Sequence, residues 1–174
     1  MKNIYVCGFM GCGKSLVSKI ISKKLKINLI DTDRQIQQSK NMQIHEIFEK
    51  YGESYFRKLE NELLKSLKNA SNSIIATGGG MLINNNENAK IAKSNGIIIF
   101  LETPFELCWN RIKNSSRPLI KNKNISEIKH LYEERQKQYR QISNIAILNN
   151  KSSIYCANKI TNIIRRRNNT NSEL

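Results

Sequence analysis

The sequence contains no apolar run close to the roughly 20 residues that a membrane-spanning helix requires. None of its four cysteines forms a C-x-x-C pair, which argues against a zinc site. The apolar stretch at the N-terminus ends after a few residues at glycines, so we expect no signal peptide. These absences predict a cytoplasmic protein with free thiols and no membrane partner.

Acidic residues are scarce, with 14 Asp and Glu against 29 Lys and Arg and a net charge of +15. Such an excess fits a nucleic acid, an anionic membrane surface or anionic small substrates as partners. The basic residues are scattered and are not interleaved with aromatic residues, so we interpret most of the excess as compositional and expect no nucleic-acid partner. A basic nucleic-acid-binding NTPase remains the alternative from another class, and it draws on Arg165-Arg166-Arg167.

The length of 174 residues suits one domain, which we place at residues 1–164, followed by a polar and frayed tail at 165–174. Short apolar stretches alternate with helical patterns, which predicts a parallel sheet between two layers of helices. We expect strands at Asn3–Cys7, Ile27–Ile30, Ser73–Ala76, Gly96–Leu101 and Ile145–Leu148. We expect helices at 14–25, 36–51 with a break near Asn41, 53–67, 89–93, 104–112, 125–141 and 154–164.

The segment after the first expected strand, Gly8–Ser15, reads GFMGCGKS and matches the pattern G-x-x-x-x-G-K-[ST]. Backbone N–H groups of such a loop bind phosphate oxygens, Lys14 would neutralise the β- and γ-phosphates, and Ser15 would bind Mg²⁺. The chain has no guanine-reading N-K-x-D motif and is short for a motor or helicase. The sequence therefore predicts a small kinase that acts on a metabolite or a nucleotide.

Three further segments could bind the acceptor. Asp31 and Asp33 end the second expected strand, where one carboxylate could orient Mg²⁺ and the other could accept a hydrogen bond from a substrate hydroxyl. An Asp that caps the next helix is the alternative interpretation. Arg57 and Glu60 share a helix face and could bind a substrate carboxylate, or form only a surface ion pair. The glycines at 78–80 leave backbone amides bare, which would allow close approach of a ligand or only a flexible turn.

The segments GFMGCGKS, DTD, GESYFRKLE and ATGGG, in this order and at these separations, resemble the shikimate kinase family. Arg117-Pro118-Leu119 resembles the lid motif of that family, and the likeness extends from Lys2 to Ile164. It implies a three-layer α/β/α P-loop kinase fold with five parallel strands, similar to nucleoside monophosphate kinases, with a mobile lid at about 112–125 and substrate-binding helices at about 33–61. It also implies Mg²⁺-dependent transfer of the γ-phosphoryl group of ATP to the 3-hydroxyl of shikimate, a step toward chorismate and the aromatic amino acids.

The resemblance also implies a role for each matching residue. The nucleotide would contact Gly11, Cys12, Gly13, Lys14, Ser15, Leu16, Arg111 and Arg117. Shikimate would contact Asp33, Arg57, Glu60, Gly78, Gly79, Gly80 and Arg135. Ser15 and Asp31 would hold Mg²⁺, and Asp33, Lys14 and Arg117 would act in catalysis, with Asp33 as the base.

Three features depart from the family pattern or leave a choice open. Cys12 stands where a small Ser or Ala is usual, which could make the loop oxidisable. The proline expected between the late Arg and Tyr139 is absent, so Arg140 competes with Arg135 for the second carboxylate-binding position. A gluconate-like or nucleotide-like kinase remains the alternative on the same scaffold, and we expect a monomer.

Overall fold

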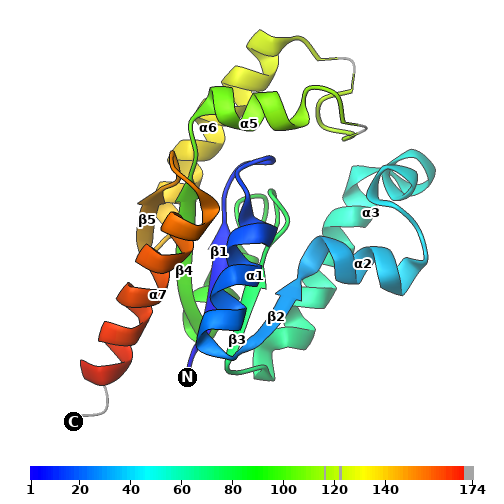
Figure 1. The fold of residues 1–174 in the computed structure, drawn as a ribbon. Coiled ribbons are helices and arrows are strands. Elements are labelled where there is room, and N and C mark those ends of the chain that lie inside the picture. Colours follow the sequence, from blue (N-terminus) through cyan, green and yellow to red (C-terminus); the bar gives the residue numbers. More distant parts are fainter. Residues whose placement is uncertain (116, 122, 171–174) are drawn as a thin grey trace.

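The computed structural model describes residues 1–115, 117–121 and 123–170. Its elements follow one another as β1 (Asn3–Cys7), α1 (Lys14–Leu25), β2 (Asn28–Asp31), α2 (Thr32–Lys40), α3 (Ile44–Ser66), the 3₁₀ turn η1 (Leu67–Asn69), β3 (Ser73–Ala76), α4 (Asn86–Asn95), β4 (Gly96–Glu102), α5 (Phe105–Ile112), α6 (Ile125–Ile142), β5 (Ile145–Leu148) and α7 (Ser153–Thr170). Strands and helices alternate along most of the chain (Figure 1), as the hydrophobic pattern predicts.

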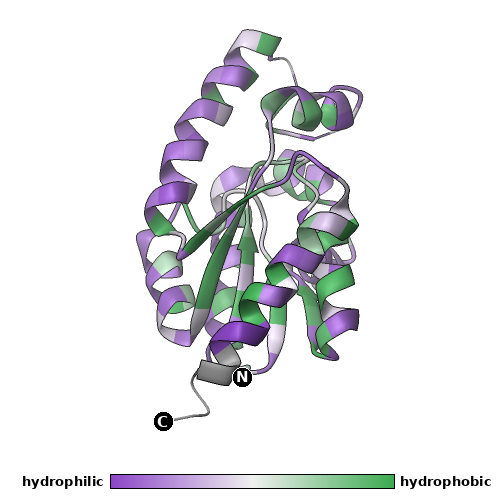
Figure 2. Ribbon diagram, turned by 60° about the vertical axis from the view of Figure 1, so that its left-hand side comes forward, coloured by the Kyte–Doolittle hydropathy of each residue, from purple (hydrophilic) through white to green (hydrophobic). Residues whose placement is uncertain are grey.

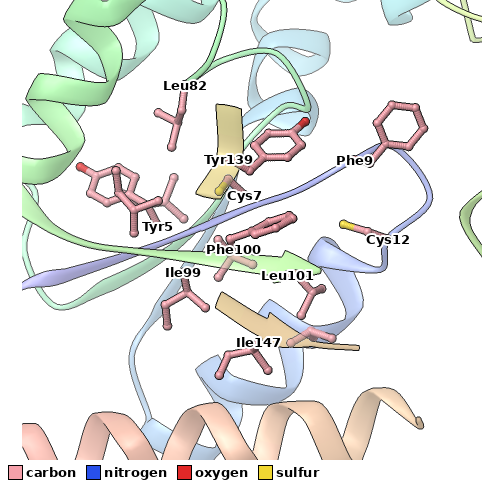
Figure 3. Packing of buried hydrophobic residues seen from close by; sticks show 14 of the residues in the cluster. Tyr5, Cys7, Phe9, Cys12, Leu82, Ile99, Phe100, Leu101, Tyr139 and Ile147 are labelled. Atoms are coloured by element: carbon pink, nitrogen blue, oxygen red, sulfur yellow. The ribbon is translucent and has the colours of Figure 1, made fainter. Parts of the chain in front are cut away.

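The strands form one parallel sheet in the order β2-β3-β1-β4-β5. Neighbouring residues of a strand point to opposite faces, and both faces of the central strands are apolar (Figure 2). Tyr5 and Phe100 lie on the face that meets Tyr139 of α6, whereas Ile99 and Leu101 lie on the face toward α1 and α7 (Figure 3). Because all five strands run parallel, their carboxyl ends meet at one edge of the sheet, and the loops that follow them lie together there.

Helices α2 and α3 extend beyond the β2 edge (Figure 1) and have a small core of their own. Ile36, Ile47, Phe56 and Leu59 form this core, apart from the main cluster around the sheet. Gly52 interrupts α3 with φ 81° and ψ 169°, which divides it at the position where the sequence separates two helices. The turn between α2 and α3 passes through Asn41 in the left-handed conformation, at the expected break.

The C-terminal helix is longer than predicted. We expected it to end at Ile164, with a frayed tail from 165, but α7 continues to Thr170. No glycine or proline interrupts residues 165–170, and Arg165 donates a hydrogen bond to the carbonyl of Lys24 at the end of α1 (3.4 Å), so the helix has both a compatible sequence and a neighbour. Residues 171–174 lie outside the described part of the chain.

Across the described ranges, none of the helices combines the length and the apolar character that a bilayer span would demand.

Candidate active site

The glycine-rich loop joins β1 to α1 at the carboxyl edge of the sheet. Gly11 has φ 78°, and a Cβ there would lie 2.7 Å from the carbonyl oxygen of Cys108, so only glycine fits between the loop and α5. The Lys14 ammonium donates to the carbonyls of Gly8 (2.7 Å) and Phe9 (3.1 Å). The Lys14 ammonium is therefore held by carbonyls of its own loop. It would exchange these carbonyls for phosphate oxygens when a nucleotide binds.

Ser15 and Asp31 meet directly in front of the loop. The Ser15 hydroxyl donates to Asp31 Oδ2 at 2.6 Å, and Asp31 Oδ1 accepts from the backbone N–H of Arg34 at 3.2 Å. Asp31 thus caps α2, as the alternative interpretation expects, and its other carboxylate oxygen lies against the Ser15 hydroxyl. A hydroxyl and a carboxylate oxygen are ligands that suit Mg²⁺, which keeps several waters and binds substrate phosphates as well.

Asp33 and Glu60 converge on Gly78 from α2 and α3. A Cβ at Gly78 would lie 2.5 Å from Glu60 Oε1 and 2.6 Å from Asp33 Oδ1, and within the described residues neither oxygen has a hydrogen-bond partner. Burial raises the pKa of Asp33, and the opposing attraction of Lys14 does not cancel this effect. The glycine is therefore needed because two carboxylates occupy the space where a side chain would be.

Arg57 is fixed by two carboxylates of its own helix. Its guanidinium donates to Glu60 Oε2 at 2.6 Å and to Glu53 Oε1 at 2.6 and 3.0 Å. Glu60 is only 1% exposed, so this is a buried ion pair and not the surface pair that the sequence also allowed. A Cβ at Gly80 would lie 2.7 Å from Arg57 Nη1, so this glycine makes room for the Arg57 guanidinium.

Arg135 and Arg140, the two candidates for the second carboxylate-binding position, lie on different sides of α6. Arg135 is 5% exposed and faces the site, and its Nη1 lacks a hydrogen-bond partner among the described residues. Arg140 is exposed and pairs with Glu102 on β4. The neighbouring Tyr139 hydroxyl donates to the carbonyl of Gly79, which connects α6 to the glycine turn.

The segment predicted as a lid is described apart from Ser116 and Asn122, which lie outside the described residues. Arg117 lines the same cavity as Asp33, and its charge opposes the rise that burial causes in the pKa of that carboxyl. Lys121 reaches across to Glu49 on α3 with 2.9 Å between Nζ and Oε1. The described part of this segment therefore contacts the helix on the far side of the cavity.

One cavity of about 600 Å³ brings most of the predicted residues together. It is lined by Ser15, Asp31, Asp33, Arg57, Glu60, Gly79, Gly80, Arg117 and Arg135. Other predicted residues lie around it: Gly78 beneath the two carboxylates, Lys14 against its own loop, and Leu16 with 54% of its surface exposed. Arg111 is exposed and donates to the carbonyl of Gly11 at 2.8 Å.

Sequence reasoning missed several residues of the cavity wall. Met10 is one of the variable residues of the glycine loop, and Arg34 follows Asp33 directly, so their neighbours in the sequence could have indicated them. Phe48 and Phe56 also line the cavity, with ring centroids 5.0 Å apart. The helical pattern assigns Phe56 to an apolar core face. Its ring packs in the small core of α2 and α3 and also forms part of the cavity wall.

The cysteines have no place in the cavity wall. All four are buried and free, and Cys12 is 0% exposed. The Lys14 ammonium lies 3.6 Å from the Cys12 sulfur. Because an oxidant must reach the sulfur, the burial of Cys12 argues against the oxidisable loop that its position suggests.

A parallel sheet, a glycine loop that holds a lysine, and a cavity with acids facing arginines define a P-loop kinase of small molecules. The fold alone is shared with a deoxyadenosine kinase from M. mycoides (TM-score 0.61, 17% identity, 94% of this chain and 98% of that one covered). A family model described as shikimate kinase matches residues 10–165, and the chain belongs to the shikimate kinase family.

Two family members show how far the likeness extends. A shikimate kinase of Persephonella marina is 41% identical over 166 residues, which cover 95% of this chain and 100% of that protein. The structure of a shikimate kinase from Acinetobacter baumannii in complex with shikimate superposes with a TM-score of 0.90 at 32% identity, covering 96% of this chain and 94% of the other.

Proposed function

We propose that this protein is a shikimate kinase that transfers the γ-phosphoryl group of ATP to the 3-hydroxyl of shikimate. The observation that carries the proposal is the cavity itself, which Asp33 lines together with Ser15 of the phosphate loop and the two arginines Arg57 and Arg135. Phosphoryl transfer requires that two oxygens are held in line while negative charge is neutralised. The chain supplies cations on the donor side and both a carboxylate and cations on the acceptor side.

The donor side is the glycine loop with Lys14 and Arg117. The loop amides and the N-terminus of α1 would bind the β-phosphate, and Lys14 would leave the carbonyls of Gly8 and Phe9 to neutralise the γ-phosphate. Arg117 lines the cavity and would approach the transferring phosphoryl group from the lid. Removal of a cation of this kind costs about 10³-fold or more in rate in phosphoryl transfer.

Ser15 and Asp31 would hold Mg²⁺, since their oxygens already meet at 2.6 Å and are of the type that this ion selects. Bound Mg²⁺ would neutralise charge on the β- and γ-phosphates. Asp31 keeps one oxygen on the backbone of α2, so the helix cap would fix the direction of the other oxygen.

On the acceptor side, Arg57 and Arg135 would bind the shikimate carboxylate. Arg57 is held in orientation by Glu53 and Glu60, and Arg135 presents a buried N–H group without a partner, which a carboxylate oxygen would satisfy. Asp33 Oδ1 likewise lacks a partner and would accept the hydrogen bond of the 3-hydroxyl. Its raised pKa makes it a better proton acceptor for that hydroxyl than an ordinary carboxylate.

The lid would exclude water during transfer. Lys121 and Glu49 connect it to α3 through an exposed ion pair, with 2.9 Å between Nζ and Oε1. Water in the site would allow ATP hydrolysis in place of transfer.

The test is ADP release from ATP and Mg²⁺ in a coupled assay, with shikimate, gluconate or a nucleoside monophosphate as acceptor. We expect rapid ADP formation with shikimate alone and only slow hydrolysis without an acceptor. Faster turnover with gluconate or a nucleotide than with shikimate would contradict the proposal.

A further inference from the structure

The carbonyl of Cys12, in the middle of the phosphate loop, is held from outside by two buried side chains. The Thr103 hydroxyl donates to it at 3.1 Å and Asn149 Nδ2 donates to it at 2.8 Å. Thr103 follows β4 and Asn149 follows β5, so the two donors come from 91 and 137 residues away in the sequence. Their exposed fractions are 0% and 3%.

The two donors are themselves fixed. Asn149 Nδ2 also contacts Thr103 Oγ1 at 3.2 Å, and the backbone N–H of Asn149 donates to the carbonyl of Glu102 at 2.6 Å. The Tyr132 hydroxyl of α6 donates to the carbonyl of Thr103 at 2.9 Å. The Cys12 carbonyl is thus bound by a rigid pair and not by mobile surface groups.

Holding this carbonyl also sets the direction of the next N–H group. In a planar trans peptide the C=O and the following N–H point in opposite directions, so a fixed Cys12 carbonyl fixes the N–H of Gly13. Gly13 is the N-cap of α1, where backbone N–H groups point toward a bound anion. Arg111 holds the preceding peptide, Gly11–Cys12, in a similar way, because its guanidinium donates to the carbonyl of Gly11 at 2.8 Å.

We propose that Thr103 and Asn149 are positioning residues of the nucleotide site, which hold the Cys12–Gly13 peptide so that the Gly13 N–H faces the ATP phosphates. This inference rests on the proposed function and adds to it two residues outside the phosphate-loop motif. We call Thr103 and Asn149 the carbonyl clamp. Backbone donors that are already oriented do not have to reorient when the nucleotide binds. Loss of the clamp would therefore weaken nucleotide binding and leave the shikimate side intact.

The experiment compares Thr103→Val, which keeps the shape and removes the hydroxyl, with Thr103→Ser, which keeps the hydroxyl. Isothermal titration with ADP and steady-state kinetics are measured for each variant. We expect Thr103→Val to weaken ADP binding and raise the KM for ATP by about tenfold, the effect of one buried hydrogen bond. Thr103→Ser should restore most of the affinity, and neither change should alter the KM for shikimate.

Thr161→Val is the matched control, because Thr161 is also a buried threonine whose hydroxyl donates to a backbone carbonyl, that of Ala157 in α7, at 2.8 Å. It should lower the melting temperature without weakening ADP binding. Asn149→Ala provides a second test should Thr103→Val unfold, and it should weaken ADP binding in the same way.

The outcomes separate the clamp from the function. If the wild-type protein binds ADP and phosphorylates shikimate while Thr103→Val or Asn149→Ala binds ADP equally well, the clamp is wrong and the proposed function stands. A parallel rise in both KM values would also overturn it, since that pattern belongs to a general loss of structure. If the wild-type protein neither binds ADP nor phosphorylates shikimate, the proposed function fails first.

Discussion

Glu60 should make the stability of this protein depend on pH in a way that Glu60→Gln removes. Burial raises the pKa of Glu60 to about 7 from an ordinary 4.5, despite the attraction of Arg57 and the hydrogen bond between them. A carboxyl whose pKa is higher in the folded state binds its proton more tightly there. Its contribution to stability is therefore complete below pH 4.5 and is lost as the pH rises through about 7. At about 1.4 kcal/mol per pH unit, this contribution amounts to about 3 kcal/mol.

The assay is urea unfolding of the wild type and Glu60→Gln at about pH 5 and about pH 8, read by circular dichroism. Between these values the wild type should lose about 2.5 kcal/mol more of its unfolding free energy than the variant does, because the contribution is not yet complete at pH 5. Glu62→Gln is the control, because Glu62 lies on the same helix with a side chain that is 58% exposed and should leave the pH dependence unchanged. If the unfolding free energies of the wild type and Glu60→Gln changed equally between the two pH values, the reasoning about the burial of Glu60 would be refuted.

Three further substitutions test the acceptor side. Asp33→Asn should reduce phosphorylation to background while ADP still binds by titration; near-normal turnover would exclude Asp33 as the base. Arg57→Lys keeps a charge beside Glu60 but loses the two-pronged guanidinium. It should therefore raise the KM for shikimate by about tenfold or more and leave the KM for ATP unchanged. Equal changes in both KM values would count against a carboxylate site. Gly78→Ala places a methyl 2.5 Å from Glu60 Oε1 and 2.6 Å from Asp33 Oδ1, so kcat should fall about tenfold or more with ADP affinity retained. A normal kcat would show that the two carboxylates can move without consequence.

The first strand and the first helix could be predicted from the sequence to the residue, whereas α2 begins at Thr32, four residues before the predicted Ile36. β1 and α1 begin and end where the apolar run, the glycines and the helical spacing predict. The interruptions at Asn41 and Gly52 also match, because both residues adopt positive φ and punctuate a helical pattern. α4 begins three residues earlier and ends two later than predicted, since its polar ends carry no apolar signal and Asn85 provides the N-cap.

The contacts between distant segments could not be predicted in this way. The sequence favoured Arg135 and kept Arg140 as the alternative, and only the packing of α6 against the sheet buries the first and exposes the second. The family resemblance predicted that Arg111 contacts the nucleotide, but its hydrogen bond to the carbonyl of Gly11, 100 residues away, had no signal in the sequence. The same holds for Thr103 and Asn149, because a lone Thr or Asn forms no pattern that indicates a carbonyl partner.

Product analysis tests the central claim most directly. ³¹P and ¹H NMR of a reaction with ATP, Mg²⁺ and shikimate should show one phosphate monoester on the 3-hydroxyl, formed in equal amount with ADP. Phosphorylation at another hydroxyl would contradict the assignment of Asp33 to the 3-hydroxyl, and ADP without a shikimate phosphate would contradict the proposed function itself.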